Sequence, residues 1–343
     1  MRILFLIALL STELTAASTQ TRQASLVYAN FFGGSDADAI EAMTTDAAGN
    51  LYVAGSSRSR DFPNARALPG LFLESQLRRS ADGGLTWTNY SDLPSGPLYA
   101  LAIHPRNSAT MLAGGYDTVY KSTDAGKTWR ATRATFPEGT VFPQPISGIT
   151  PPFGIHSVAY DPRDPSIVYA TREPGGVIKS VDGGETWTVA NNGLVATGSW
   201  VYAGPIAVGS SRLFVTSFQG LFRSTDGAAS WTQVQGLPDG IGRVAFHPRV
   251  ADRVYAISNG ALFRSDDAGD QWKRLTANFG VQAPSLAFDP VQNDTVYIVQ
   301  DNAVMRSVDA GASFTLWKNV GGNVNGIVEH PQRPGELLID TYQ

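Results

Sequence analysis

Several loop residues of this chain combine aromatic rings with arginine and carboxylate groups, a chemistry that can bind a sugar or a peptide segment. An aromatic ring offers an apolar platform, and an arginine offers paired N–H donors to a carboxylate. Exposed loop residues without any ligand are also common, so a bare solvated surface remains the alternative. The candidate ligand-binding residues are Arg58, Arg60, Asp61, Tyr116, Asp117, Arg172, Glu173, Trp200 and Tyr202.

Three of the four histidines could suggest a zinc site. His104, His247 and His330 each precede a proline at the end of an apolar run, and Asp161 and Asp289 occupy the same place in other runs. A position that alternates between His and Asp can cap a turn by accepting hydrogen bonds from the backbone. We therefore interpret these residues as turn caps and predict no metal site.

Two pairs of carboxylates, Asp36 with Asp38 and Asp266 with Asp267, could act as an acid and a base or could hold calcium. Neither pair has the ligand spacing of a calcium loop, and Asp267 belongs to a repeated turn. We interpret both pairs as turn residues. The sequence thus predicts no catalytic residue and no cofactor.

The elements that position these loops are organised around an eight-residue phrase, Ser-x-Asp-x-Gly-x-x-Trp, that occurs six times. Its aspartates recur every 41 to 44 residues, except for one interval of 58 residues. A period of about 40 to 45 residues is typical of a four-stranded propeller blade, which needs neighbours to bury its apolar face. The Ser and Asp residues of the six copies are Ser80, Asp82, Ser122, Asp124, Ser180, Asp182, Ser224, Asp226, Ser265, Asp267, Ser307 and Asp309, within residues 80–87, 122–129, 180–187, 224–231, 265–272 and 307–314.

Each repeat contains the apolar runs expected of four strands. A first run ends at a proline, as in HSVAYDP, and a second is rich in β-branched and aromatic residues, as in IVYATR. A third run such as GVIKS leads into the phrase, and the fourth leaves it through the tryptophan. Helical periodicity is absent. The sequence predicts an all-β protein, with a single β-propeller of four-stranded antiparallel blades over residues 25–343.

The phrase itself suits a hairpin turn between the third and fourth strands, because Ser and Asp accept backbone hydrogen bonds and Gly adopts a positive φ. It resembles the Asp-box, or BNR, repeat of sialidases, sortilin-type receptor ectodomains, xyloglucan-cleaving glycoside hydrolases and photosystem II assembly-factor propellers. Ala228, Gln271 and Phe314 depart from the pattern, and we expect the turn to be looser there.

A second resemblance concerns the N-terminal stretch from Phe31 to Pro63, which is similar to a repeat of bacterial extracellular seven-bladed propellers. This stretch aligns with the first two strands of a blade. The segment from Asn323 to Tyr342 holds only two strands, and the apolar run 25–32 could add an outer strand to it. We therefore expect seven blades, with the N-terminal strand completing the last blade, and keep six blades as the alternative.

Strand order assigns the connections of each blade to two faces. The turns between strands one and two and the boxed turns between strands three and four share one face, and all other connections leave the opposite face. The boxed face repeats too regularly to carry specificity, so we expect the binding site on the opposite, loop-rich face. The nine candidate residues lie there, together with the long Pro-rich link 133–153.

Composition indicates the compartment. Residues 1–17 have the layout of a secretory signal peptide, with Arg2, an apolar stretch from Ile3 to Leu10, and small residues at the end. The apolar stretch is too short to span a bilayer, so we expect no integral membrane segment after cleavage. The chain has no cysteine and therefore no disulfide. We expect a secreted or periplasmic protein of bacterial origin.

The charge balance excludes one class of partner. The chain carries 26 Lys and Arg residues against 30 Asp and Glu residues, and its formal net charge is −4. Its basic residues form only short groups such as Arg78 with Arg79. Nucleic acid binding needs a basic surface, so we expect no nucleic acid partner. We also expect a monomer.

Three functions compete. The first is a non-catalytic secreted propeller that binds or scaffolds a protein or glycan partner through its loop-rich face, as the sortilin and assembly-factor resemblance implies. The second is a sialidase-like glycosidase, but the three-arginine site and the Arg-Ile-Pro phrase of that family have no match here. The third is a xyloglucanase-like hydrolase, although those enzymes use a cleft between two propellers. We favour binding and keep the glycoside hydrolases as the alternative.

Overall fold

The computed structural model describes residues 25–31, 38–57, 74–82, 86–90, 96–134, 154–197, 200–279, 285–289, 291–300, 302–320, 323–329 and 336–342. The expected signal peptide 1–17 lies outside the described residues, as do Arg58, Arg60, Asp61, His330 and most of the link 133–153. No helix in the described part of the chain has the length and apolar character needed to cross a membrane.

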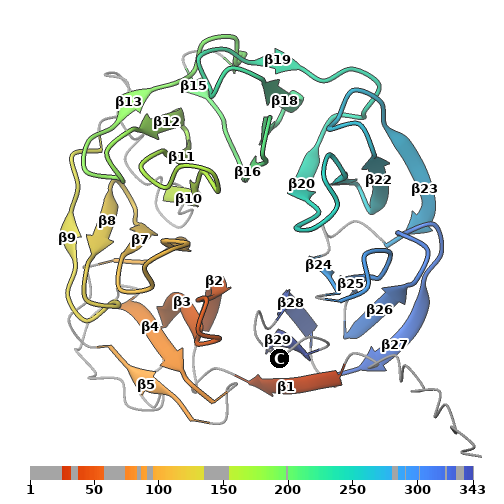
Figure 1. Cartoon of the computed structure of the whole chain (residues 1–343), viewed down its shortest axis with the longest axis horizontal. Helices are drawn as coiled ribbons and strands as arrows, with labels where there is room; N and C mark the ends of the chain where they lie inside the picture. Colours follow the sequence, from red (N-terminus) through yellow and green to blue (C-terminus); the bar gives the residue numbers. More distant parts are fainter. Residues whose placement is uncertain are drawn as a thin grey trace, which may run out of the picture.

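The described chain forms six four-stranded antiparallel sheets that follow one another around a ring (Figure 1). Within each sheet the strands pair in chain order, so each sheet is one up-and-down blade. The blades are β2(Asp38–Thr45), β3(Leu51–Ser57), β4(Glu74–Ser80), β5(Thr88–Asn89); β6(Ala100–Ile103), β7(Met111–Gly114), β8(Val119–Ser122), β9(Arg130–Ala131); β10(Gly154–Tyr160), β11(Val168–Glu173), β12(Gly176–Ser180), β13(Thr188–Val189); β16(Ile206–Val208), β17(Leu213–Ser217), β18(Gly220–Ser224), β19(Thr232–Gln233); β20(Ile241–Phe246), β21(Val254–Ser258), β22(Ala261–Ser265), β23(Lys273–Asn278); and β24(Leu286–Phe288), β25(Val296–Gln300), β26(Ala303–Ser307), β27(Thr315–Asn319).

The expectation of seven blades is wrong, because the described chain contains six. The remaining large sheet has only three strands, in the order β1(Ser25–Phe31), β29(Glu336–Tyr342), β28(Asn323–Glu329). The N-terminal strand does pair with the C-terminal segment as expected, but β1 runs parallel to β29, whereas blade strands are antiparallel. This sheet also lacks a boxed turn. A short hairpin, β14(Ala196–Thr197) with β15(Trp200–Val201), lies between blades three and four.

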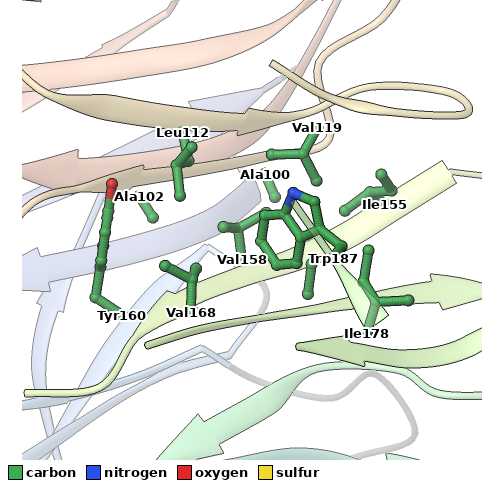
Figure 2. Close-up of a cluster of buried hydrophobic side chains, with 11 residues drawn as sticks. Ala100, Ala102, Leu112, Val119, Ile155, Val158, Tyr160, Val168, Ile178 and Trp187 are labelled. Atoms are coloured by element: carbon green, nitrogen blue, oxygen red, sulfur yellow. The ribbon is translucent and has the colours of Figure 1, made fainter. Parts of the chain in front are cut away.

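Apolar side chains between neighbouring blades hold the ring together. The innermost strands β2, β6, β10, β16 and β20 contact one another in sequence, and β28 contacts both β24 and β2. Figure 2 shows one inter-blade cluster, in which Leu112 and Val119 of blade two pack against Val158, Ile178 and Trp187 of blade three. Since each blade buries an apolar face only against its neighbours, closure of the ring is what makes the core.

The boxed turns have the geometry that their sequence predicts. The Ser180 hydroxyl donates to the Asp182 carboxylate at 2.7 Å and accepts from the Gly184 backbone N–H at 2.8 Å. Two consecutive residues of the turn have positive φ, 70° at Gly183 and 87° at Gly184. Left-handed backbone at two positions explains why glycine is common there.

The departure at Ala228 does not loosen its turn, which corrects our expectation. Ala228 adopts a φ of 68°, and its N–H donates to the Ser224 hydroxyl at 2.8 Å, as glycine does in the other turns. The departure at Gln271 does remove a contact. The other five turns have a Thr or Ser hydroxyl that donates to the Asp, and Gln271 has no hydroxyl to offer to Asp267, although its N–H still donates at 2.9 Å.

The capping role is confirmed for His104 and His247. The Nδ1 atom of His247 accepts from the N–H groups of Arg249 and Val250 at 3.1 and 2.9 Å, and burial lowers the pKa of His247 to about 4. Asp161 and Asp289 accept equivalent backbone bonds in their own blades. A neutral imidazole and a carboxylate can therefore perform the same turn-capping task.

Basic residues of the boxed face connect several blades to the next blade. The residue before the boxed serine reaches a carbonyl of the following box: Lys121 donates to the carbonyl of Gly183 at 2.8 Å, and Lys179 donates to that of Gly227 at 2.8 Å. Arg264 likewise donates to the carbonyl of Ala310 at 3.0 Å. These bonds all run in the same direction around the ring. Polar groups of the boxed face are therefore bonded to other parts of the fold.

Candidate functional site

The boxed turns and the turns between strands one and two lie together, which fixes the two faces. The N–H of Gly183 donates to the carbonyl of Ser166 at 2.7 Å, and that of Ala268 donates to the carbonyl of Asp252 at 2.7 Å. Each bond joins a boxed turn to the first turn of its own blade. The innermost strands therefore begin at the opposite face, where the candidate site must be built.

A ring of equivalent positions marks this end of the innermost strands. We define the mouth layer as the residue four places before the last paired residue of each innermost strand. Four of these residues fall at β-bulges, where the pairing register shifts. A bulge re-aims its side chain and is common beside functional sites. The described residues of the mouth layer are Glu41, Tyr99, His156, Gly204, Gly242 and Asn325.

The mouth layer is unequal around the ring. Blades one, two and three contribute Glu41, Tyr99 and His156, whereas blades four and five contribute Gly204 and Gly242. The rings of Tyr99 and His156 lie 5.1 Å apart at 48°. Three neighbouring blades thus bring a carboxylate, a phenol and an imidazole to one side of the mouth.

Close backbone packing sets the position of the tyrosine. Tyr99 lies against Gly154, where a Cβ atom would collide with the aromatic ring. The N–H of Tyr99 donates to the carbonyl of Gly114 at 2.9 Å, and that of Ile155 donates to the carbonyl of Gly115 at 2.9 Å. The first bond lies within blade two and the second joins blade three to blade two, so backbone of both blades is fixed around the ring of Tyr99.

Burial perturbs the titrating groups of the mouth. It raises the pKa of Glu41 and of Glu173, and the charge of His156 partly opposes both shifts. Burial, helped by the charge of Glu41, raises the pKa of Tyr99 to about 12. Carboxyl groups with raised pKa can donate as well as accept hydrogen bonds, and they exchange protons closer to neutral pH than ordinary carboxyl groups.

Four of the sequence-predicted residues lie beside this group. Arg172 is 4% exposed and ends β11 with Glu173. Burial lowers the pKa of Arg172, and the charges of Asp117 and Tyr116 oppose that shift. Glu173 is paired with Gly154 across the strands and therefore lies next to the mouth layer. Tyr116 is exposed, with 38% of its surface open to solvent.

The other predicted residues are elsewhere. Trp200 belongs to the β14–β15 hairpin, and Tyr202 follows it. The ring of Tyr202 lies 4.7 Å from that of Phe218, which is 62% exposed, so these two form a separate aromatic patch on blade four. Arg58, Arg60 and Asp61 fall outside the described residues, so the structure does not place them.

Sequence reasoning missed Glu41, Tyr99 and His156. None belongs to the boxed phrase or to a predicted loop: Glu41 and His156 lie in β2 and β10, and Tyr99 directly precedes β6. Counting back a fixed number of residues from the turn that follows the first strand of each blade would have aligned these three residues. Among the described residues, no group of three or more His, Cys, Asp or Glu is arranged to hold a metal ion.

The chain is an Asp-box β-propeller, as the ring of blades and the six boxed turns show. A family model described as Sortilin, neurotensin receptor 3 matches residues 219–329. That range covers blades five and six and part of blade four.

Comparisons with known proteins extend this similarity. A xyloglucanase from Paenibacillus sp. is 28% identical over 187 residues, which cover 46% of this chain and 17% of the length of that enzyme. Among solved structures, YCF48 bound to D1 peptide has a TM-score of 0.59 at 15% identity and covers 90% of this chain and 92% of its own. An ancestral GH74 enzyme has a TM-score of 0.57 at 17% identity, covering 86% of this chain but 38% of its own.

Proposed function

We propose that this chain is a secreted, non-catalytic propeller that binds an extended segment of a protein partner at the mouth layer. The observation that carries the proposal is the unequal mouth: Glu41, Tyr99 and His156 converge from three adjacent blades, and glycines follow on the next two. A fold built from repeats does not need such asymmetry, so it indicates a ligand.

The chemistry of the mouth suits an extended backbone. Tyr99 and His156 provide rigid rings for apolar contact, and Glu41 and Glu173 can accept or donate hydrogen bonds to peptide groups. The missing side chains at Gly204 and Gly242 leave the mouth lined by backbone at blades four and five, and this backbone can approach a bound segment closely.

The comparisons support a protein partner over a glycan. The solved structure of YCF48 contains a bound D1 peptide, and it matches this chain over nearly the whole length of both. The enzymes that are similar to this chain are much longer than it, so a single propeller corresponds to only part of each. The signal-peptide layout of residues 1–17 supports action outside the cytoplasm.

The test is selection of binding segments from a random peptide library on the purified mature protein, followed by fluorescence anisotropy. We expect Tyr99→Ala and His156→Ala to weaken the selected segments at least tenfold, because both rings contact the ligand. The control is Lys127→Ala, on the exposed boxed face, which should change nothing. Segments that bind equally well to all three variants would overturn the proposal.

Glycoside hydrolysis is the second candidate, because Glu41 and Glu173 are two carboxyl groups with raised pKa near one mouth. A raised pKa is what a general acid needs. Hydrolysis of xyloglucan oligosaccharides by the wild type that is lost in Glu41→Gln and in Glu173→Gln would establish this candidate. We expect no turnover with either the wild type or the variants.

A further inference from the structure

Two departures from the repeat meet at one place on blade four. The first is the hairpin β14–β15, which lies between blades three and four (Figure 1) and leads directly into Tyr202. No other connection between blades in the described part of the chain contains a hairpin. The second departure is the turn between β17 and β18, which begins with Phe218. The rings of Tyr202 and Phe218 lie 4.7 Å apart, and we call this pair of rings the aromatic patch.

Phe218 is not a residue that its turn requires. The turn follows Ser217, and the equivalent turn of blade five has Asn259 in the place of Phe218. Asn is typical of tight hairpin turns, whereas an aromatic residue has no special role in them. Phe218 is 62% exposed, more than any other aromatic side chain that the structure describes. A residue that departs from a local rule without a gain for the fold indicates function.

Backbone hydrogen bonds hold the aromatic patch in place. The N–H of Gly175, in the turn between β11 and β12, donates to the carbonyl of Val201 at 2.8 Å, which fixes the end of the inserted hairpin to blade three. The N–H of Gly204 donates to the carbonyl of Thr216 at 2.9 Å, and each of these residues lies two places from one of the rings. The two rings therefore belong to segments that are fixed to each other and to blade three. Aromatic side chains held in this way lose little conformational entropy on binding.

The aromatic patch borders the mouth layer. Tyr202 lies two residues before Gly204 of that layer. The N–H of Ile206 donates to the Ser157 hydroxyl at 3.3 Å, and Ser157 directly follows His156 on β10. The innermost strands β10 and β16 also contact each other. A segment that is bound at the mouth and runs from blade three toward blade four therefore meets the aromatic patch next.

We propose that the aromatic patch binds a large apolar side chain of the partner segment, beyond the residue that contacts Tyr99 and His156. This inference rests on the proposed function, because it assigns a second side chain of the same segment. The two ring planes are inclined at 47°, and neither of the segments 202–205 and 217–220 contains a charged residue. An apolar side chain placed against both rings removes apolar surface from water and thereby stabilises the complex.

The aromatic patch suits a sugar less well than an apolar side chain. A sugar stacks on a flat platform and needs polar groups beside it for its hydroxyls. Two inclined rings do not form such a platform. The polar side chains at the turn are Ser217 and Gln219, and they bond to each other, because the Ser217 hydroxyl donates to the amide oxygen of Gln219 at 2.5 Å. We therefore assign the patch to a protein segment.

The experiment selects segments from one random peptide library on the wild type and, in parallel, on Phe218→Asn. This substitution removes the ring and gives the turn the residue that blade five has, so the urea midpoint of unfolding should not fall. We expect the wild type to select segments that share an aromatic or large aliphatic residue at one position, and Phe218→Asn to select segments without it. In fluorescence anisotropy, the wild-type segments should bind Phe218→Asn at least fivefold more weakly. Phe218→Ser takes its place if the midpoint does fall.

The matched control is Val308→Asn. Val308 is also 62% exposed, but it lies in the boxed turn of blade six. Its substitution removes a similar exposed apolar side chain from the opposite face. We expect it to change neither the selected segments nor their affinity.

A double-mutant cycle assigns the contact. Replacing the shared apolar residue of the segment by alanine should abolish the difference between the wild type and Phe218→Asn but preserve the effect of Tyr99→Ala. Equal affinity of the wild type and Phe218→Asn, with Tyr99→Ala still weakening binding, would overturn this inference and leave the proposed function standing. Weakening by Phe218→Asn but not by Tyr99→Ala would instead overturn the function proposed for the mouth. Binding of a xyloglucan oligosaccharide that is lost in Phe218→Asn would overturn the assignment to a protein segment.

Discussion

The two faces of the ring differ in where their polar groups find partners. On the boxed face, the hydroxyl of Ser180 and the carboxylate of Asp182 bond within the turn, and Lys179 bonds to the next blade. This arrangement recurs from blade to blade. At the mouth, Glu41 and His156 occupy equivalent positions but differ in chemistry, and burial perturbs the glutamate. Repeated polar groups stabilise the ring, whereas the unrepeated ones carry the binding role that we propose.

The largest expected effect on the boxed side of this comparison is the loss of an inter-blade tryptophan. Trp187 is 4% exposed, packs between blades two and three, and donates to the Thr132 hydroxyl at 3.1 Å. We expect Trp187→Ala to lower the free energy of unfolding by about 3 to 5 kcal/mol, measured by urea denaturation.

The matched control is Trp129→Ala. Trp129 is only partly buried and donates to the carbonyl of Gly126 in its own turn, at 3.0 Å. Its loss should cost clearly less than the loss of Trp187. Trp129 also packs against an inter-blade cluster that contains Leu77 of blade one, so equal losses would show that the deeper burial of Trp187 adds nothing to its inter-blade contact.

A smaller effect is expected from the boxed serine. Ser180→Ala leaves the buried N–H of Gly184 without its acceptor and removes a donor to Asp182. An unsatisfied buried donor costs about 1 to 3 kcal/mol, and we expect a loss of that size in urea denaturation. Thr188→Ala removes an exposed hydroxyl from the adjacent strand and serves as the control. A loss no larger than that of Thr188→Ala would mean that the turn does not depend on its serine.

The sequence predicted the boxed face well because every repeat must form the same turn and therefore carries the same residues. Six copies of one phrase identified the turns, and the alternation of His247 with Asp161 identified the caps. The parallel pairing of β1 with β29 was not predictable from apolar runs, because a run of seven residues does not specify strand direction. The prediction of a seventh blade was wrong because this sheet has only three strands, one of them parallel to its neighbour.

The mouth was predicted less completely. The sequence placed Arg172, Glu173 and Tyr116 on the same face as the mouth layer, because strand order alone assigns a face to each loop. It missed Glu41 and His156, since single polar residues at strand starts are not exceptional until the register aligns them across blades. The function proposed for the mouth therefore depends on differences between repeats, whereas the fold depends on their similarity.

The next smaller loss of stability is expected from the lysine that joins blades three and four. Lys179→Met keeps most of the aliphatic chain and removes the donor to the carbonyl of Gly227, at 2.8 Å. We expect a loss of about 1 kcal/mol in the free energy of unfolding. Lys127→Met, on an exposed turn position, is the control and should be neutral. If both substitutions are neutral, the bond from Lys179 does not contribute to the union of the blades.

The smallest expected effect is on the pH dependence of stability. As the pH rises, the boxed face contributes more to stability and the mouth contributes less. Hydrogen bonds in the boxed turns lower the pKa of Asp124 and of Asp226 to about 2, so their contribution is lost as the pH falls below their unfolded value of 3.8. Burial raises the pKa of Glu173 above 4.5. The folded protein then holds a proton that the unfolded chain releases, so stability declines as the pH rises through the window above 4.5.

We therefore expect Glu173→Gln to flatten the decline above pH 4.5 and to leave the loss at low pH unchanged. Because solvent screens this partly exposed group, the change should be less than about 1 kcal/mol. Asp226→Asn should do the reverse, removing part of the low-pH loss alone. Urea denaturation across the acidic and neutral range measures both. A decline of the same slope in Glu173→Gln and in the wild type would show that burial at the mouth does not raise the pKa of Glu173. The contrast between the two faces would then depend only on which residues repeat around the ring.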